Sequence, residues 1–500
     1  MYNAYITRIK NMHKHPNADR LQIGECFGNA VIVSMEYEDN QLGVYFPSDG
    51  QLSVEFAEAN NLLRKKDENG NNIGGYMDPD KRNVTAIKLR GEKSDGLFLP
   101  LKSLESFGDI STLKEGDRID AFNGHEICCK YVPRRQNRRG HYSEGNKTRK
   151  KKVPVAPLFA EHADTEQLAY NLAAFKPGDE IEITLKMHGT SQRTGYLPVF
   201  KGYKKDFWGR IMSCVKPKSE FAKKLLAKAE VHATPLYDWG YVSGTRRTVL
   251  ENFEGGYYGS NEFREAHSKF FEGKLNKGEE IFYEVVGYTH TGAPIMASGD
   301  NKKLNDKDFV KQYGQTTVFS YGCVPYAHAE EHYNDSRPGY QDEPVEVHFP
   351  QSNIYVYRMT MTNEDGFTVE YSPDFMRYRC EQMGVKTVPV LAKGKINETR
   401  DNHPYLDYYN LVAGFNNSSV SCDTPGECVK YVAEQFYDGP DPVGKTHIRE
   451  GVVVRIINRP KFCAYKHKNW YFKALEGIVK VEAETPDIEE AESVVENDME

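Results

Sequence analysis

The sequence predicts an α+β protein in which a small β-barrel precedes a larger domain of sheets and helices. Short alternating runs broken by turn residues fill residues 1–125, and strand-like runs alternate with helical segments over 153–480. The chain of 500 residues is long enough for about two to four domains, and its 32 tyrosines and 25 phenylalanines can supply a substantial core. No apolar run approaches membrane-spanning length, and nine scattered cysteines indicate reduced thiols in a cytoplasmic setting.

The barrel prediction depends on alternation of apolar and polar side chains in the first 125 residues. Such alternation is expected of strands that are buried on one face only. It occurs at 30–35, 42–46 and 84–90. Turn residues separate these runs at short intervals, which favours a small barrel of short strands.

Two strings in this region resemble motifs of the tRNA-binding OB domain found in the β subunit of phenylalanyl-tRNA synthetase. His15 to Leu21, which reads HPNADRL, resembles its opening motif, and Leu89 to Leu99, LRGEKSDGLFL, resembles its later Gly-x-x-Ser-x-Gly strand. The resemblance implies an OB-like, tRNA-binding-like domain over residues 1–125. The alternative is a barrel that uses both strings only as turns.

A basic linker is predicted at 126–152, between the barrel and the larger domain. Within it, ten basic side chains face a single acidic one, Glu144, over residues 130–152. Such a run is typical of a solvated linker, and it also has the charge to follow a phosphate backbone. At the other end of the chain, residues 482–500 hold nine acidic residues and no basic one, which predicts a disordered tail over 481–500.

The larger domain combines strands, helices and one clear hairpin. A strand is predicted at 181–185, and helices are predicted at 216–230, 374–383 and 424–437. The hairpin pairs 354–361 with 367–371 around an Asp-Gly turn.

The strand at 181–185 runs directly into the segment Lys186-Met187-His188-Gly189-Thr190-Ser191. A lysine at the end of a strand, followed by a glycine turn and two hydroxyl groups, suits a covalent nucleophile. Its amine would attack the α-phosphate of a nucleotide, while the N–H groups of the turn and the hydroxyls hold the phosphates. Taken alone, the same string is also typical of an ordinary polar turn.

Charged and aromatic side chains recur on predicted strands and turns further along the chain. The segments are Ser243 to Arg247, Glu279 to Tyr288, Ile354 to Met361, Arg449 to Arg455 and Tyr465 to Lys473. In this order, and after the Lys186 segment, they resemble motifs I, Ia, III, IIIa, IV and V of the covalent nucleotidyltransferases. The resemblance covers about 153–480 and implies antiparallel sheets with flanking helices.

The histidine at position 188 points to one branch of that superfamily. Nick-sealing RNA ligases of the phage and kinetoplastid editing types have histidine there, whereas DNA ligases and capping enzymes usually have aspartate. The hairpin and the segment 380–391 also resemble this branch. An OB-like domain before the transferase domain resembles the RNA-ligase group typified by a deinococcal bacterium and a Naegleria amoeba. The chain departs from the pattern by candidate insertions at 202–236, 322–350 and 395–445.

The resemblance implies an ATP-dependent RNA ligase that works in three steps. Lys186 takes AMP from ATP, the AMP passes to an RNA 5′-phosphate, and a 3′-OH then attacks with release of AMP. The implied cofactors are ATP and Mg²⁺ or Mn²⁺. The implied partner is nicked duplex RNA with 3′-OH and 5′-phosphate ends, with RNA repair as the setting, and we expect a cytoplasmic monomer.

The resemblance also implies a role for each motif residue. The catalytic residues are Lys186, Lys466, Lys468 and Glu450, and the metal ligands are Glu284 and Glu450, one of which would also bind the ribose hydroxyls. Lys466 would neutralise charge on the α-phosphate, and Arg246 and Lys468 would hold phosphates. Tyr357 is the first candidate to stack on adenine and Phe319 the second. The remaining nucleotide contacts are Leu185, His188, Gly189, Ser191 and Arg193, the last toward the ribose or the 3′-OH end.

Two other hypotheses remain open at the level of sequence. A DNA ligase or capping enzyme would need an OB domain after motif V, and only about twenty residues follow Lys480. A non-catalytic RNA-binding protein on a ligase scaffold is the other. The retained charged residues at 186, 450, 466 and 468 argue against it, because buried charges are costly to keep without a use.

Overall fold

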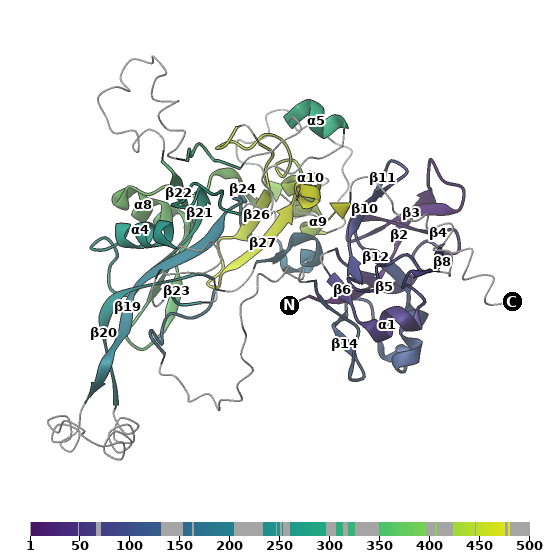
Figure 1. The fold of residues 1–500 in the computed structure, drawn as a ribbon, viewed down its shortest axis with the longest axis horizontal. Helices are drawn as coiled ribbons and strands as arrows, with labels where there is room; N and C mark the ends of the chain where they lie inside the picture. Colours follow the sequence, from purple (N-terminus) through teal and green to yellow (C-terminus); the bar gives the residue numbers. More distant parts are fainter. Residues whose placement is uncertain are drawn as a thin grey trace. The chain divides into compact units, whose positions relative to one another are not determined.

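The computed structural model is mixed α+β, with most of its regular structure in strands of several sheets. It describes residues 2–48, 50–66, 72–131, 154–162, 165–204, 234–246, 248–250, 253, 261–296, 307–313, 319–325, 350–396, 406–407, 424–445, 447–475 and 479–480. The chain divides into two compact units (Figure 1). The first unit is Met1–Tyr142, Asn301–Thr317 and Asn469–Glu500, and the second unit is Ser143–Asp300 and Val318–Lys468.

The first unit is built from small sheets of short strands. One has the order β12 (Leu97–Pro100), β5 (Leu42–Phe46), β1 (Ala4–Arg8), β13 (Arg118–Ile119), and another the order β2 (Lys10–Lys14), β3 (Leu21–Cys26), β4 (Asn29–Ser34). A third has the order β16 (Cys128–Lys130), β6 (Gly50–Leu52), β9 (Asn83–Val84), and a fourth the order β11 (Glu92–Ser94), β10 (Ala86–Leu89), β28 (Val479–Lys480). Two further sheets have two strands each. One pairs β7 (Lys65–Lys66) with β8 (Asn72–Gly74), and the other pairs β14 (Ala121–Phe122) with β15 (His125–Glu126).

These sheets do not join into a closed barrel over the residues described for the unit. Many of the strands that would have to join them are only two or three residues long, so each offers few hydrogen bonds for closure. The short helices are α1 (Val54–Ala59), α5 (Lys307–Tyr313), α10 (Trp470–Leu475) and the 3₁₀ turns Leu101–Phe107 and Ile110–Thr112. The aromatic core includes Phe46, Phe56 and Phe107, with Phe56 on α1 placed between the other two rings.

The two motif strings of the first unit lie against each other. His15 contacts the carbonyl of Leu89 through its Nε2 at 3.2 Å, and the side-chain amide of Asn17 donates to the carbonyl of Arg90 at 2.8 Å. The strings therefore hold a loop to a strand about 70 residues further along the chain.

The segment that follows the last motif strand packs within the first unit. Strand β28 pairs in parallel with β10, and Lys473 on α10 makes an ion pair with Asp95 at 2.5 Å. The ammonium of Lys93 lies 5.3 Å from the ring centroids of both Trp470 and Tyr471. Residues 469–475 and 479–480, predicted as part of the larger domain, thus pack with the N-terminal strands.

The second unit contains two antiparallel sheets. The first sheet has the order β17 (Glu166–Gln167), β27 (Cys463–Lys468), β26 (Gly451–Ile456), β18 (Glu180–Leu185), β24 (Val390–Ile396), β25 (Leu406–Asp407), in which only the β17–β27 pair is parallel among the described strands. The second sheet has the order β20 (Thr234–Gly244), β19 (Thr190–Lys204), β21 (Glu279–Gly287), β22 (Ser352–Thr362), β23 (Thr368–Glu370). Short 3₁₀ turns lie at Leu168–Tyr170 and Leu172–Ala174.

Three helices cover these sheets, and two of them begin at clear capping residues. Helix α8 (Pro373–Met383) has Ser372 as its N-cap and Gly384 in the left-handed conformation after its last residue. Helix α9 (Pro425–Glu434) begins with a capping box of Thr424 and Glu427. Valines of α9 pack on the first sheet, whereas α8 and α4 (Glu262–Phe270) pack on the second.

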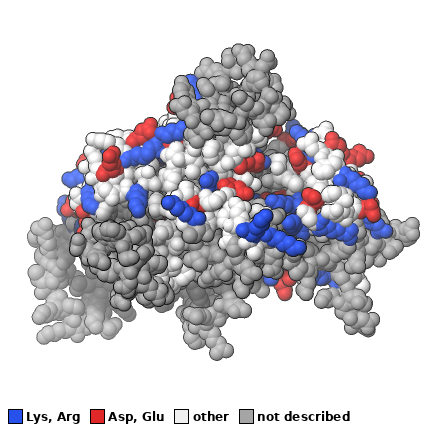
Figure 2. All heavy atoms as spheres, turned by 90° about the horizontal axis from the view of Figure 1, so that it is seen from above, with Lys and Arg blue, Asp and Glu red and all other residues white. Residues whose placement is uncertain are grey.

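The structure confirms the predicted strand at 181–185, the hairpin and the helices near 374–383 and 424–437. The helix predicted at 216–230, most of the basic linker and the acidic tail lie outside the described residues. Within that linker, residue 126 belongs to β15 and residues 128–130 form β16. Among the described residues, no helix is both long and apolar enough to cross a membrane. On the face drawn in Figure 2, acidic and basic side chains are interspersed, with basic ones gathered in a group right of the centre.

Candidate active site

The turn after β18 places Lys186 where the two sheets of the second unit meet. The N–H of Lys186 donates to the carbonyl of Gly451 at 3.0 Å, which fixes the turn to the first residue of β26. Strand β19 starts at Thr190 and pairs with β21 of the other sheet. Between them, Gly189 lies so close to that sheet that a Cβ would stand 2.3 Å from the carbonyl oxygen of Val285, so a side chain does not fit.

Glu450 is the centre of the charged cluster around this lysine. Its Oε1 lies 2.6 Å from the Nζ of Lys186 and 3.5 Å from the Nζ of Lys468, and its Oε2 lies 3.8 Å from the Nδ1 of His188. Burial of Glu450 would raise its pKa, but these three neighbours lower it more, so the net pKa is lowered and the carboxylate stays ionised. The next residue is Gly451, where a Cβ would meet the carbonyl oxygen of His467 at 2.1 Å.

The two lysines of β27 face the same side of their strand. Side chains alternate along a strand, so Lys466 points to the same face as Lys468, which contacts Glu450. On the other face Tyr465 packs against Phe175, and the His467 ring lies near Glu434. The strand therefore presents both predicted lysines to the site.

Glu284 on β21 brings a second carboxyl to the cluster from the other sheet. Burial raises its pKa to about 7 and the charge of Glu450 adds to the rise, while Lys186, Arg246 and Arg264 oppose it. The two carboxyls have opposite shifts because Glu450 contacts cations directly, whereas Glu284 does not have a close ion pair among the described residues. Arg246 itself is exposed in the turn after β20.

The two carboxyls suit a hydrated divalent cation. The buried Oε2 of Glu450 accepts no hydrogen bond. A cation would also stabilise the ionised form of Glu284, whose pKa is raised. The part of the chain that the structure describes has no cluster of three or more His, Cys, Asp or Glu that could enclose a metal. The arrangement therefore fits Mg²⁺ or Mn²⁺ held by one or two carboxylates and water.

Tyr357 and Ser191 close one side of the cluster. Their hydroxyl oxygens are 3.0 Å apart and hydrogen-bonded, and both side chains are partly buried. Burial raises the pKa of Tyr357 to about 12, with the nearby carboxyl of Glu284 as a further cause. The tyrosine hydroxyl is thus neutral, and its hydrogen bond to Ser191 joins it to the segment that begins at Lys186.

Phe319 lies under the motif I turn and is almost completely buried. Its ring meets the ring of His188 edge to face with centroids 4.9 Å apart, and it lies 4.7 Å from the ring of His447. The neighbouring Tyr321 accepts a hydrogen bond from the N–H of His188 at 2.7 Å through its hydroxyl. These aromatic groups hold His188 in place.

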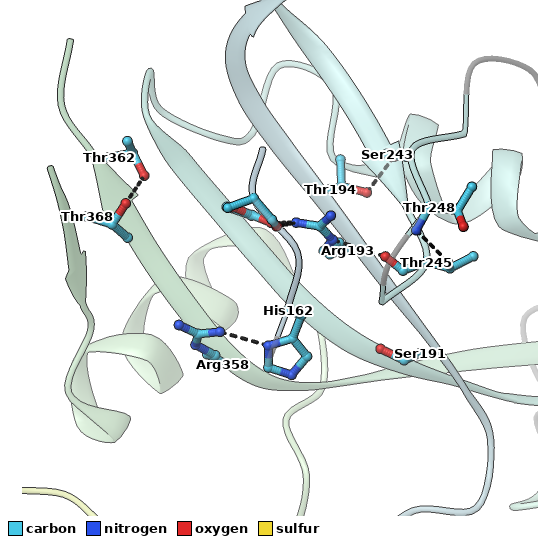
Figure 3. A network of polar contacts seen from close by, with 12 residues as sticks. His162, Ser191, Arg193, Thr194, Ser243, Thr245, Thr248, Arg358, Thr362 and Thr368 are labelled. Carbon is cyan, nitrogen blue, oxygen red and sulfur yellow. Dashed lines mark hydrogen bonds and ion pairs between the residues drawn. The ribbon is translucent and has the colours of Figure 1, made fainter. Parts of the chain in front are cut away.

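Arg193 is also buried, and its guanidinium is used by the protein itself (Figure 3). It donates to Glu280 at 2.9 Å and to the carbonyl of Thr245 at 3.0 Å, and it lies over the ring of Phe159 at 3.7 Å. Burial raises the pKa of Glu280 to about 7, although Arg193 lowers it. The structure places this arginine as a link between β19, β21 and the turn that carries Arg246.

Sequence patterns missed a second set of residues that order the site. Arg264 on α4 donates to the carbonyl of Ser191 at 3.1 Å and to the hydroxyl of Thr190 at 2.5 Å. Arg358 on β22 pairs with Glu370 through two nitrogens and contacts Nδ1 of His162 at 2.8 Å (Figure 3). These partners are far apart in sequence, except for the hairpin pair, so a local motif does not reveal them.

Comparison with known proteins gives a structural likeness only. No family model and no curated protein matches the chain. Naegleria gruberi RNA ligase with PPi is similar to it at 15% sequence identity and a TM-score of 0.49, covering 94% of this chain and 97% of that chain. A mutant of that ligase with ATP and Mn has 14% sequence identity to this chain and a TM-score of 0.49. Another mutant, with AMP and Mn, has 14% sequence identity and a TM-score of 0.48. Each match covers 95% of this chain and 98% of that chain. These likenesses concern the arrangement of the chain, so the chemistry has to come from the residues of the site.

Proposed function

We propose that the protein is an ATP-dependent RNA ligase that joins a 3′-OH to a 5′-phosphate at nicks in duplex RNA. The observation that carries the proposal is the buried Glu450 carboxylate, which holds Lys186 and Lys468 together at 2.6 and 3.5 Å. These residues come from separate motif segments, and Glu284 faces them from the second sheet. A lysine, two further cations and two carboxyls in one place suit nucleotidyl transfer better than a structural ion pair.

The first step forms a phosphoramidate on Lys186. Its Nζ attacks the α-phosphorus of ATP, a P–N bond forms, and the bond to the bridging oxygen breaks with pyrophosphate as the leaving group. The proton that the amine gives up passes to solvent or to the departing pyrophosphate. Glu450 Oε1 lies 2.6 Å from Nζ and orients the amine. Lys466 and Lys468 face the phosphates and offset the charge that develops on the α-phosphate. A hydrated Mg²⁺ or Mn²⁺ held by Glu284 and Glu450 would supply further positive charge there.

The two later steps use the same cluster. An oxygen of the RNA 5′-phosphate attacks the phosphorus of the lysyl-AMP, and the P–N bond breaks to return Lys186. The 3′-OH oxygen then attacks the 5′-phosphorus, loses its proton, and AMP leaves. We assign the adenine contact to Tyr357 and a phosphate contact to Arg246, whose side chain is exposed.

We assign RNA rather than DNA on His188, which motif I of DNA ligases usually replaces by aspartate. The first unit is proposed as a further contact for the RNA. The experiment compares labelled nicked duplexes in which the joined strand is RNA or DNA. We expect sealing of the RNA nick with ATP and Mg²⁺, loss of sealing in Lys186→Ala, and normal sealing in the matched control Lys269→Ala, whose lysine is exposed on α4. Sealing of the DNA nick alone would overturn the RNA assignment.

A further inference from the structure

Strands β19 and β20 continue beyond the sheet as a two-stranded ribbon. They pair from Arg193 with Gly244 out to Lys204 with Thr234, whereas β21 pairs with β19 only over Thr190 to Gly195. Over the outer part, residues 196–204 and 234–241, no third strand is present among the described residues. Figure 1 shows these strands extending away from the helices of the second unit. We call this outer part the ribbon.

One face of the ribbon is used for packing. Leu197, Val199 and Val242 are buried against Ala156 and Phe159. On the opposite face, Tyr196 and Tyr241 pack against the core formed by α4 and β21, and Tyr241 accepts a hydrogen bond from the N–H of Gly273 at 2.6 Å. Apolar partners therefore cover the inner end of that face as well.

The opposite face carries a row of aromatic rings. Tyr241 and Tyr196 stack with centroids 4.7 Å apart, and Trp239 follows at 5.9 Å from Tyr196. Further out, the ring of Phe200 lies 6.0 Å from that of Tyr237, directly across the ribbon. All five rings are partly buried. Tyr196 and Tyr241 pack against the core, whereas Trp239, Phe200 and Tyr237 are not among the residues that pack against it.

The row ends at Tyr203, whose ring is 5.0 Å from that of Phe200 and 40% exposed. Exposed aromatic rings in sequence along a strand offer the flat apolar faces on which unpaired bases stack. Stacking does not depend on which base is present, so such a row suits a nucleic-acid strand of any sequence.

Basic side chains accompany the aromatic row. Lys201 and Lys204 are exposed on the ribbon, and Lys277 lies 5.4 Å from the ring of Trp239, while Asp238 is the single acidic residue of the described ribbon. The 29 residues between the strands, 205–233, contain seven Lys or Arg and three Asp or Glu. In a chain whose formal net charge is −7, this concentration of positive charge favours a polyanion as the partner.

We propose that the ribbon binds unpaired bases of the RNA substrate at a distance from the sealing site. Phe200 and Tyr203 lie 9 and 12 residues beyond Ser191 on one continuous strand. At about 3.3 Å per residue they stand at most roughly 30 to 40 Å from it. At about 3.4 Å per nucleotide this span matches roughly nine to twelve nucleotides. The inference rests on the proposed function, and it adds a binding element for single-stranded RNA beside the nick.

The test measures RNA affinity without catalysis. The full chain is titrated against two fluorescently labelled nicked RNA duplexes with about nine base pairs on each side of the nick, one blunt and one with single-stranded extensions of about six nucleotides. The aromatic variant is Phe200→Ala with Tyr203→Ala, and the basic variant is Lys201→Ala with Lys204→Ala. The matched controls are Tyr378→Ala, which removes a tyrosine 54% exposed on α8, and Lys269→Ala.

We expect the parent protein to bind the extended RNA more tightly than the blunt RNA. The aromatic variant should lose this preference, with a loss of roughly 5- to 100-fold in affinity for the extended RNA. The basic variant should weaken both RNAs and flatten the dependence on salt. The controls should bind as the parent does.

Equal affinity of the parent for both RNAs would overturn the proposal, and so would an aromatic variant that keeps the preference. Transfer of label from ATP to Lys186 is measured in every variant, and it should be unchanged because the ribbon lies away from that lysine. Absence of this label in the parent would instead contradict the proposed ligase function. The two failures are therefore distinguishable.

Discussion

Replacement of Glu284 by glutamine should stabilise the nucleotide-free protein at neutral pH while it removes ligase activity. Burial raises the pKa of Glu284 from its ordinary 4.5 to about 7. At about 1.4 kcal/mol per pKa unit, the ionised carboxylate in the folded protein costs up to about 3 kcal/mol. Water at this partly exposed side chain reduces the figure, so it is an upper limit.

The sign of the effect follows from proton binding. Below pH 4.5 Glu284 is protonated in both the folded and the unfolded chain, and it carries no penalty. Between pH 4.5 and about 7 the folded protein binds more protons at this position than the unfolded chain does, so its stability falls as pH rises. Glutamine does not titrate, so the advantage of Glu284→Gln should open over this window and stay constant above it.

The assay is urea unfolding with a metal chelator present, from pH 4.5 to 8, for the parent and Glu284→Gln. Glu272→Gln, at an exposed glutamate of the same unit, is the control and should show no such window. A difference between parent and Glu284→Gln that does not change with pH, or a less stable Glu284→Gln at pH 8, would refute the reasoning. Formation of the lysyl-AMP adduct should be lost in Glu284→Gln.

Four further substitutions, at three positions, test the roles assigned to individual side chains. Glu450→Ala should lower the free energy of unfolding by roughly 3 to 5 kcal/mol, because Lys186 loses its buried counterion, and urea unfolding measures this. Tyr357→Phe should lower the free energy of unfolding by about 1 kcal/mol, because the hydrogen bond to Ser191 is lost, but it should change the KM for ATP by less than about threefold. Tyr357→Ala should raise that KM at least about tenfold in an adenylation titration, because the ring is lost. Arg358→Ala should destabilise the protein by at most roughly 3 to 5 kcal/mol, since the buried Glu370 carboxylate loses its closest partner but keeps Arg455 at 3.6 Å, and it should leave the KM for ATP unchanged where the variant is folded.

Each of these expectations has a contrary result. An unchanged urea midpoint in Glu450→Ala would mean that its ion pair is not buried as described. A tenfold rise of KM in Tyr357→Phe would assign the hydroxyl rather than the ring to ATP. A raised KM in folded Arg358→Ala would place that arginine in the nucleotide site.

The local elements could be predicted because their signals lie within a few residues. Ser372 and Gly384 mark the two ends of α8, and Thr424 with Glu427 marks the start of α9. The turn at Lys186 was predictable for the same reason, since a strand, a lysine and a glycine follow one another directly.

The long-range contacts could not be predicted from sequence. Arg264 orders the motif I turn from 73 residues away, and no spacing rule connects the two. Phe319 and Arg193 were named as nucleotide contacts, and the structure shows that both are enclosed by the protein, one under His188 and one against Glu280. Burial of this kind depends on how the two sheets meet, which periodicity along one strand does not report.

The most direct test of the central claim is the covalent adduct. The protein is incubated with ATP labelled at the α-phosphate and Mg²⁺, then denatured, and the label is located on the chain by peptide mapping. The account predicts acid-labile label on Lys186 and none in Lys186→Ala, with Lys269→Ala labelled as the parent is. Label on another residue, or no label on the parent protein, would contradict it.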